Sequence, residues 1–397
     1  MATSPDRAIA AASSIQQLFR SSRKGQSHKP DALPPPTPAR LQASLSETPY
    51  DLYEYLAQST AQRSTVLYLA YGSNLSNETF RGKRGIKPIS QINVQVPSLR
   101  MTFDLPGIPY SEPCFANSGT RDPDNDPPQH DSQLTSSDEK TPLLSAKDVS
   151  RKDEYHKNSW HKGLIGVVYE CTPEDYAHII ATEGGGASYH DVLVDCHPFA
   201  SADPTQPVLQ NPTTPPFKAH TLFAPAAPPG KAPKNGGRLQ RPDMSYAQPS
   251  ARYLKLITDG ADELGLPNEY QEYLHSIHPF TITSGKQRVG QFIFLAIWLP
   301  IVAFFFTTGQ LFQDKSGRLP QWLVEFVGAI FKAVWGSYDG FFKPVFGDGE
   351  RSIPDGGKDA VEDYGAVAKR ERVRLSGIVG IRSEERDLEK AAAGDVR

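Results

Sequence analysis

Glu183 is the residue of this sequence whose position best suits proton transfer. It closes a predicted helix within residues 171–189 and lies three, four and seven positions after Ile180, Ile179 and Tyr176, so its side chain projects from the apolar face. Partial burial and the negative end of the helix dipole would both raise the pKa of a carboxyl group at that position. Such a group can serve as a general acid and base, whereas the alternative is an acid exposed at a frayed helix end.

A short loop that contains glycine is the second feature with chemical potential. It follows the apolar run V-L-Y-L-A (66–70) and consists of Tyr71, Gly72, Ser73, Asn74 and Leu75. Glycine lets the main chain turn sharply and lets a ligand approach it, and serine and asparagine readily begin a helix. The main-chain N–H groups of such a junction can bind an anion, or an oxyanion that forms during a reaction. A plain turn is the alternative for this loop.

Apolar runs separated by turn residues predict the elements that must position these two features. Strands are expected at 66–70, 92–96, 99–103, 164–171, 189–196 and 217–223. Two helices are expected between 250 and 276, interrupted by Gly265-Leu266-Pro267, and a short helix is expected at 52–61.

Four blocks of the sequence, in this order, resemble the γ-glutamylcyclotransferases. They are Tyr71 to Leu75 after a hydrophobic strand, Gly166 to Tyr169, Glu183-Gly184 followed by Tyr189, and the segment 249–274, P-S-A-R-Y-L-K-L-I-T-D-G-A-D-E-L-G-L-P-N-E-Y-Q-E-Y-L. Together they cover somewhat under half of the chain. The resemblance implies an α+β fold with a compact, mixed, barrel-like domain.

The resemblance also implies a reaction, the cyclisation of a γ-glutamyl group to 5-oxoproline with release of an amino acid or another amine. Carried over by position, Glu183 matches the catalytic glutamate of the family. Tyr71 to Leu75 match the loop that receives the γ-glutamyl group, and Tyr189 and Tyr253 match tyrosines that line the pocket. The implied partner is a small γ-glutamyl molecule, and neither a metal nor an organic cofactor is required.

Two other functions remain open at this point. One is a cyclotransferase that acts on γ-glutamyl-amine conjugates rather than on peptides. The other is a non-catalytic, membrane-anchored binding or scaffold protein that keeps the fold. The presence of both Glu183 and the Tyr71 to Leu75 loop argues against the second, because a scaffold needs neither.

The most hydrophobic run of the chain, residues 289–312, contains no charged residue. At about 1.5 Å per residue it is long enough to cross a bilayer core of about 30 Å, which predicts a single transmembrane helix. Residues 319–346 combine aromatic and charged residues and predict an amphipathic segment at the membrane interface. A buried core helix is the alternative for the first segment, and a helix packed on protein is the alternative for the second.

The composition predicts one domain with long unstructured parts. The chain has 397 residues, of which 35 are proline and 31 glycine, and these lie mostly outside the apolar segments. We expect a disordered tail at 1–62, a catalytic domain at 63–285 with disordered insertions at 119–158 and 198–250, and a charged mobile tail at 347–397.

Charge and cysteine content limit the possible partners and compartments. A formal net charge of −3 argues against nucleic-acid binding, and three widely spaced cysteines predict neither a disulfide framework nor a zinc site. We therefore expect a membrane protein with a single span, whose catalytic domain faces the reducing cytosol. The sequence does not indicate an oligomeric state.

Overall fold

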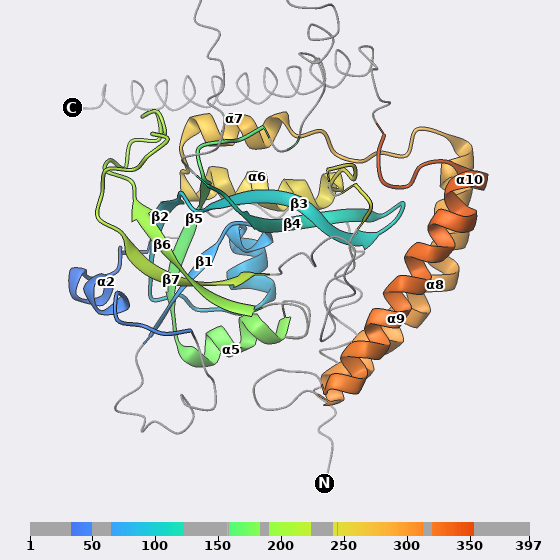
Figure 1. Cartoon of the computed structure of the whole chain (residues 1–397), viewed down its shortest axis with the longest axis horizontal. Helices are drawn as coiled ribbons and strands as arrows, with labels where there is room; N and C mark the ends of the chain where they lie inside the picture. The colour runs from blue at the N-terminus through green and yellow to red at the C-terminus, as the bar shows by residue number, and fades with distance from the viewer. Residues whose placement is uncertain are drawn as a thin grey trace, which may run out of the picture. The chain divides into compact units, whose positions relative to one another are not determined.

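The chain folds around a closed barrel of five strands in the order β1–β5–β2–β6–β7 (Figure 1). This computed structural model describes residues 33–49, 65–122, 157, 159–182, 190–223, 241–243, 245–312 and 320–352. The barrel strands are β1 (Val66–Ala70), β2 (Ser90–Val96), β5 (Leu164–Cys171), β6 (His190–Pro198) and β7 (Phe217–Phe223). The fold is therefore α+β, with a barrel as its core.

The strands β1 and β5 are buried on both faces because barrel and helices cover them. They pair antiparallel, with Tyr68 opposite Tyr169, and all five residues of β1 are buried. Gly166 of β5 needs its missing side chain, because a Cβ there would collide with the carbonyl oxygen of Ala70. This close approach fixes the end of β1, from which the Tyr71 to Leu75 loop departs.

The barrel closes where β7 meets β1 in parallel, at the single pair Tyr68 and His220. A short helix, α2 (Pro38–Ser44), covers this closure. Thr37 caps α2, since its hydroxyl accepts a hydrogen bond from the N–H of Arg40, and Ser44 accepts one from the N–H of Lys218 in β7 at 3.0 Å. Residues 33–49, which the sequence placed in a disordered tail, are therefore an ordered part of the barrel.

A long antiparallel pair, β3 (Leu99–Ile108) and β4 (Glu112–Thr120), stands beside the barrel and is joined by a turn at Tyr110. Two helices, α6 (Ala251–Leu264) and α7 (Asn268–Ser276), pack onto the core. Ser250 caps α6 by accepting a hydrogen bond from the N–H of Tyr253, and Gly265 ends it in the left-handed conformation, with φ 61°. Helix α5 (Pro173–Thr182) packs on the core through Tyr176 and Ile179.

Two long helices, α8 (Gly285–Phe312) and α9 (Gln321–Ser337), run side by side (Figure 1). A π-helical turn (Tyr338–Phe342) and α10 (Lys343–Phe346) continue α9. The start of α8 and the end of α9, which we call the base of the pair, enclose a second apolar cluster. It consists of Tyr110, Phe294, Val334, Trp335, Tyr338 and Phe342. The segment expected as a span and the segment expected at the interface thus form one helical hairpin.

The structure confirms the strands expected at 66–70, 164–171 and 217–223 with the same bounds. It extends the other three expected strands and confirms the helix break at Gly265. It adds β4, which the sequence did not predict, and orders residues 199–216 within the expected insertion at 198–250. The helix expected at 52–61 and most of the insertion at 119–158 lie outside the described residues.

Candidate active site

The Tyr71 to Leu75 loop leaves the barrel as one tight turn of 3-10 helix, Ser73–Leu75. The N–H of Leu75 donates to the carbonyl of Gly72 at 3.0 Å, and the N–H of Ser76 donates to the carbonyl of Ser73 at 3.2 Å. Gly72 and Ser73 are half-buried, whereas Asn74 and Leu75 are buried. A ligand would therefore reach the main chain of this loop at Gly72 and Ser73.

Asn74 fastens the loop to the barrel wall. Its side-chain amide donates to the hydroxyl of Tyr68 at 2.8 Å, and only 4% of Asn74 is exposed. Tyr68 lies on β1 and packs against the ring of Tyr176 from α5, with centroids 5.8 Å apart. A buried hydrogen bond of this kind holds the loop in one conformation relative to both β1 and α5.

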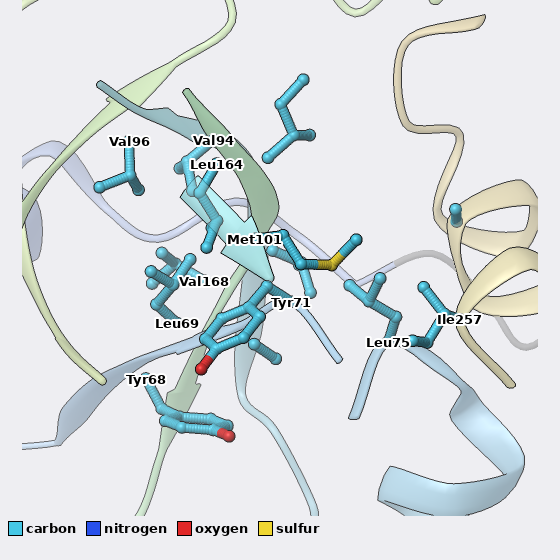
Figure 2. Close-up of a cluster of buried hydrophobic side chains, with 14 of the residues drawn as sticks. Tyr68, Leu69, Tyr71, Leu75, Val94, Val96, Met101, Leu164, Val168 and Ile257 are labelled. Carbon is cyan, nitrogen blue, oxygen red and sulfur yellow. The ribbon is translucent and has the colours of Figure 1, made fainter. Parts of the chain in front are cut away.

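Helix α6 presses directly on the loop at Gly260. A Cβ at this position would lie 2.5 Å from the nitrogen of Ser76 and 2.7 Å from the Cβ of Leu75, distances that real Cβ atoms essentially never show. Figure 2 shows the Leu75 side chain beside Ile257 of the same helix. The loop is thus held between β1 and α6 with no room for a side chain at Gly260.

Strand β4 supplies a third wall. The N–H of Ala116 donates to the hydroxyl of Tyr253 at 3.1 Å, and the hydroxyl of Tyr71 donates to Ser118 Oγ at 3.2 Å. The Tyr253 hydroxyl also lies 3.4 Å from the position that a Cβ of Gly72 would take. Tyr253 therefore stands beside the half-buried part of the loop, where a bound ligand would meet it.

Comparison of this sequence with known proteins identifies its family. Residues 284–345 match the family model described as the AclK C-terminal domain. The chain is 31% identical to gamma-glutamyl cyclotransferase verK of Clonostachys rogersoniana over 187 residues, which are 47% of this chain and 80% of that protein. It is 28% identical to gamma-glutamyl cyclotransferase gliK of Aspergillus fumigatus over 72% of this chain and 89% of that protein. This chain belongs to the γ-glutamyl cyclotransferase family.

The chain was also compared with a solved structure. That structure is named gamma-glutamyl cyclotransferase, covers 56% of this chain and 96% of its own, and has 17% sequence identity and a TM-score of 0.34. The family assignment rests on the sequence relatives.

In this member of the γ-glutamyl cyclotransferase family, the structure brings together six of the eight residues that the sequence proposed for the site. Tyr71, Gly72, Ser73, Asn74, Leu75 and Tyr253 lie around one loop. Glu183, directly after the last residue of α5, and Tyr189, directly before β6, lie outside the described residues, so their roles stay a prediction. Ala116 and Ser118 join the site from β4, which sequence reasoning missed because that strand has no apolar run.

A buried charged cluster beside the barrel closure was also missed. His220 Nδ1 lies 3.0 Å from the carboxylate of Asp191, and His220 Nε2 lies 3.3 Å from that of Glu47. Tyr176 donates a hydrogen bond to the same carboxylate of Asp191. Burial by itself would lower the pKa of His220, but the hydrogen bonds and charges of the two carboxylates raise it to about 9. Its members are far apart in the sequence, and His220 lies in a strand that also contains Lys218 and Thr221, so no local pattern marks the cluster.

The described residues contain no group of three or more His, Cys, Asp or Glu side chains that could hold a metal ion. All three cysteines are free and buried, and burial raises the pKa of the Cys114 thiol to about 12. A thiol of such high pKa is a poor nucleophile at neutral pH.

Proposed function

We propose that this protein cyclises the γ-glutamyl group of a small molecule to 5-oxoproline and releases the attached amine. The observation that carries the proposal is the loop from Tyr71 to Leu75, held between β1, β4 and α6 with the Tyr253 hydroxyl beside Gly72. Sequence relatives that are named gamma-glutamyl cyclotransferases support the same reaction class.

The reaction needs a base because the nucleophile belongs to the substrate. The α-amine of the γ-glutamyl group attacks its own γ-carbonyl carbon, and a C–N bond forms as the amine loses a proton. The tetrahedral intermediate then expels the leaving nitrogen, which must gain a proton as the original amide C–N bond breaks. One carboxyl group can take the first proton and return it to the leaving group.

We assign this role to Glu183. Tyr176 and Ile179, which lie seven and four positions earlier in α5, are fully buried. Continuation of the same helical face would direct the Glu183 carboxyl group toward the barrel. A partly buried carboxyl group has a raised pKa, which suits both the uptake and the return of a proton.

The loop would bind the reacting group. We propose that the main-chain N–H groups of Gly72 and Ser73 stabilise the oxyanion of the intermediate, and one such donor typically contributes about 3 kcal/mol. We assign Tyr253 and Tyr189 to the walls that fold the substrate so that its amine lies close to its γ-carbonyl carbon. Such positioning supplies much of the rate enhancement of an intramolecular reaction.

We place the reaction at the cytosolic side of a membrane. The cytosolic side is our inference from three widely spaced cysteines that suggest no disulfide framework. Helix α8 is long and apolar enough to cross a bilayer by length and composition. The test below distinguishes an amino acid from a larger conjugate as the leaving group.

The test measures release of 5-oxoproline by the full chain from γ-glutamyl dipeptides and from γ-glutamyl conjugates of apolar amines. Because general acid–base catalysis contributes about 10²–10⁴-fold, Glu183→Gln is expected to lower kcat at least ~100-fold. Glu174→Gln, in the first turn of the same helix, is the matched control and is expected to retain activity. Turnover that survives in Glu183→Gln would refute the mechanism. No turnover of any substrate by folded wild-type protein would favour the binding-protein alternative.

A further inference from the structure

Helices α8 and α9 form an antiparallel hairpin with a fixed register. Trp298 Nε1 donates to Ser337 Oγ at 3.0 Å near the base, and the rings of Phe312 and Trp322 meet at 5.6 Å near the tip. In an antiparallel pair of helices, the residue numbers of facing positions have a constant sum. The two contacts give nearly the same sum, so both fit one register. The second helix therefore returns along the first.

Both ends of the hairpin are fixed to one residue of the domain. Tyr110, at the β3–β4 turn, donates from its hydroxyl to the carbonyl of Gly347 at 2.7 Å, and its N–H donates to the carbonyl of Gly349 at 2.8 Å. At the start of α8, the side-chain amide of Gln291 donates to the carbonyl of Tyr110 at 2.7 Å. A chain that enters and leaves at the same residue does not fit the single crossing expected from the sequence.

The outer face of α8 is apolar and exposed. Its exposed large residues are Val289, Phe292, Ile297, Ile301 and Phe304, and Phe292 is 75% exposed. Only 22% of the candidate span is buried, whereas the core helix of a soluble protein would be mostly buried. An apolar face of this extent marks a surface for a partner or a membrane.

The exposed surface of α9 is mixed: it carries the apolar residues Trp322 and Phe326, 57% and 47% exposed, and a line of charge also runs along it. Glu325, Lys332 and Asp339 follow one another at intervals of seven residues, which places them on one side of the helix. Glu325 and Lys332 are exposed, and Asp339 pairs with Arg241 at 2.6 Å. Charges in the middle of a bilayer are costly, so this line disfavours a hairpin that crosses the membrane.

The base of α8 adds a preference for anionic headgroups. Lys286 and Arg288 lie exposed in its first turns, next to Val289 and Phe292 of the apolar face. Basic residues flanking an apolar helix face are typical of helices that lie at the surface of an anionic membrane.

We propose that the α8–α9 hairpin lies in the plane of a membrane surface, with the outer face of α8 in the lipid and the charged line of α9 toward water. Both ends of the hairpin then stay on the side of the bilayer that carries the barrel. This attachment is independent of the reaction at the barrel, and it replaces a transmembrane anchor by a monotopic one.

The first test is flotation of the full chain with vesicles of phosphatidylcholine that contain a minority of phosphatidylserine. The wild type is expected to float with the vesicles. The double variant Phe292→Glu, Phe304→Glu is expected to lower the bound fraction at least ~10-fold, because burial of one Phe side chain in the lipid strengthens binding by more than that factor. Leu209→Glu changes an equally apolar residue outside the hairpin, 55% exposed, and should float like the wild type. Thermal unfolding checks that both variants fold. A wild type that stays unbound, or binds only as a larger oligomer, would overturn the proposal.

The second test determines the side on which each part lies. Cysteines replace Ser276, Ser316 and Ser376, one at a time, and a membrane-impermeant maleimide labels sealed vesicles from expressing cells. The three natural cysteines are buried and should stay unlabelled. Labelling of all three positions from the same side is the expected result. Ser376 on the opposite side would show a single crossing, and Ser316 alone on the opposite side would show a crossing hairpin. Either would refute in-plane attachment.

Discussion

Gly260→Ala is the substitution that most directly tests how the active-site loop is held. The new methyl group would lie 2.5 Å from the nitrogen of Ser76 and closer still to the carbonyl carbon of Leu75. Ordinary contact begins near 3.4 Å, so α6 or the loop must move by roughly 1 Å. Overpacking of this kind costs about 1–3 kcal/mol, and the better helix propensity of alanine offsets up to about 1 kcal/mol of it.

The expected loss of stability is therefore modest, about 1–2 kcal/mol. For a domain of this size that corresponds to a fall in Tm of about 2–8 °C. The expected loss of activity is larger, because a displacement of about 1 Å in a reacting geometry can cost about 10²-fold in rate. Release of 5-oxoproline, measured well below both melting temperatures, separates the two effects.

The matched control is Gly82→Ala in the π-helical turn Glu78–Lys83, which follows the loop; a Cβ there would meet only the carbonyl oxygen of Asn77, at 3.8 Å. This variant is expected to keep both Tm and activity. If Gly260→Ala loses several degrees of Tm but keeps wild-type kcat/KM, the loop does not position the substrate, and the reasoning about the site is wrong.

Three further predictions concern other parts of the molecule. His220, with a pKa of about 9 in the folded state against an ordinary 6.5, stabilises the fold fully below pH 6.5, and this contribution is lost as the pH rises through 9. Urea unfolding from pH 6 to 10 should therefore show an alkaline decline that His220→Gln flattens and that the exposed control His275→Gln leaves unchanged. Asn74→Ala removes the donor to the Tyr68 hydroxyl, and should cost about 1–3 kcal/mol in unfolding and lower kcat/KM; unchanged values for both would contradict the role of this bond. Tyr110→Ala should speed hydrogen exchange at the base of α8 without changing the unfolding of the barrel, and unaltered exchange there would show that Tyr110 does not hold the hairpin.

The sequence predicts the barrel well where burial determines the pattern. The runs 66–70 and 164–171 consist almost entirely of large apolar residues, because strands of a covered barrel are buried on both faces. In contrast, β4 reads E-P-C-F-A-N-S-G-T and contains a proline, a glycine and small polar residues. It forms by pairing with β3, a long-range partner that no local pattern reveals.

The N-terminal helix was missed for a related reason. The run P-P-P-T-P-A-R around Thr37 has the composition of polyproline, yet its threonine caps a helix and its last proline occupies the first turn. What holds α2 in place is contact with β7, far along the chain. The same limit applies to the His220 cluster, whose members come from three separate segments.

Glu183 and the Tyr71 to Leu75 loop were proposed from local pattern, and the resemblance of the motifs then added Tyr189 and Tyr253; all these site roles stay predictions. The loop from Tyr71 to Leu75 and the distant Tyr253 are neighbours only because α6 can approach the loop at Gly260. The hairpin was read as two separate membrane segments, since the register between α8 and α9 depends on side-chain contacts that periodicity does not encode.

The wide spacing of the contacts that complete the barrel has a consequence for its synthesis. The hydrogen bond of Ser44 in α2 needs Lys218, which is 174 residues later in the chain. That of Gln248 needs Ser352, which is 104 residues later. On the ribosome, β1 emerges early and keeps an unpaired edge until β7 has been made. Folds with such distant contacts form slowly and expose strand edges meanwhile. A polypeptide released before residue 352 would lack the segment that joins the hairpin to the barrel, so nascent chains of this protein are expected to depend on chaperones until translation is nearly complete.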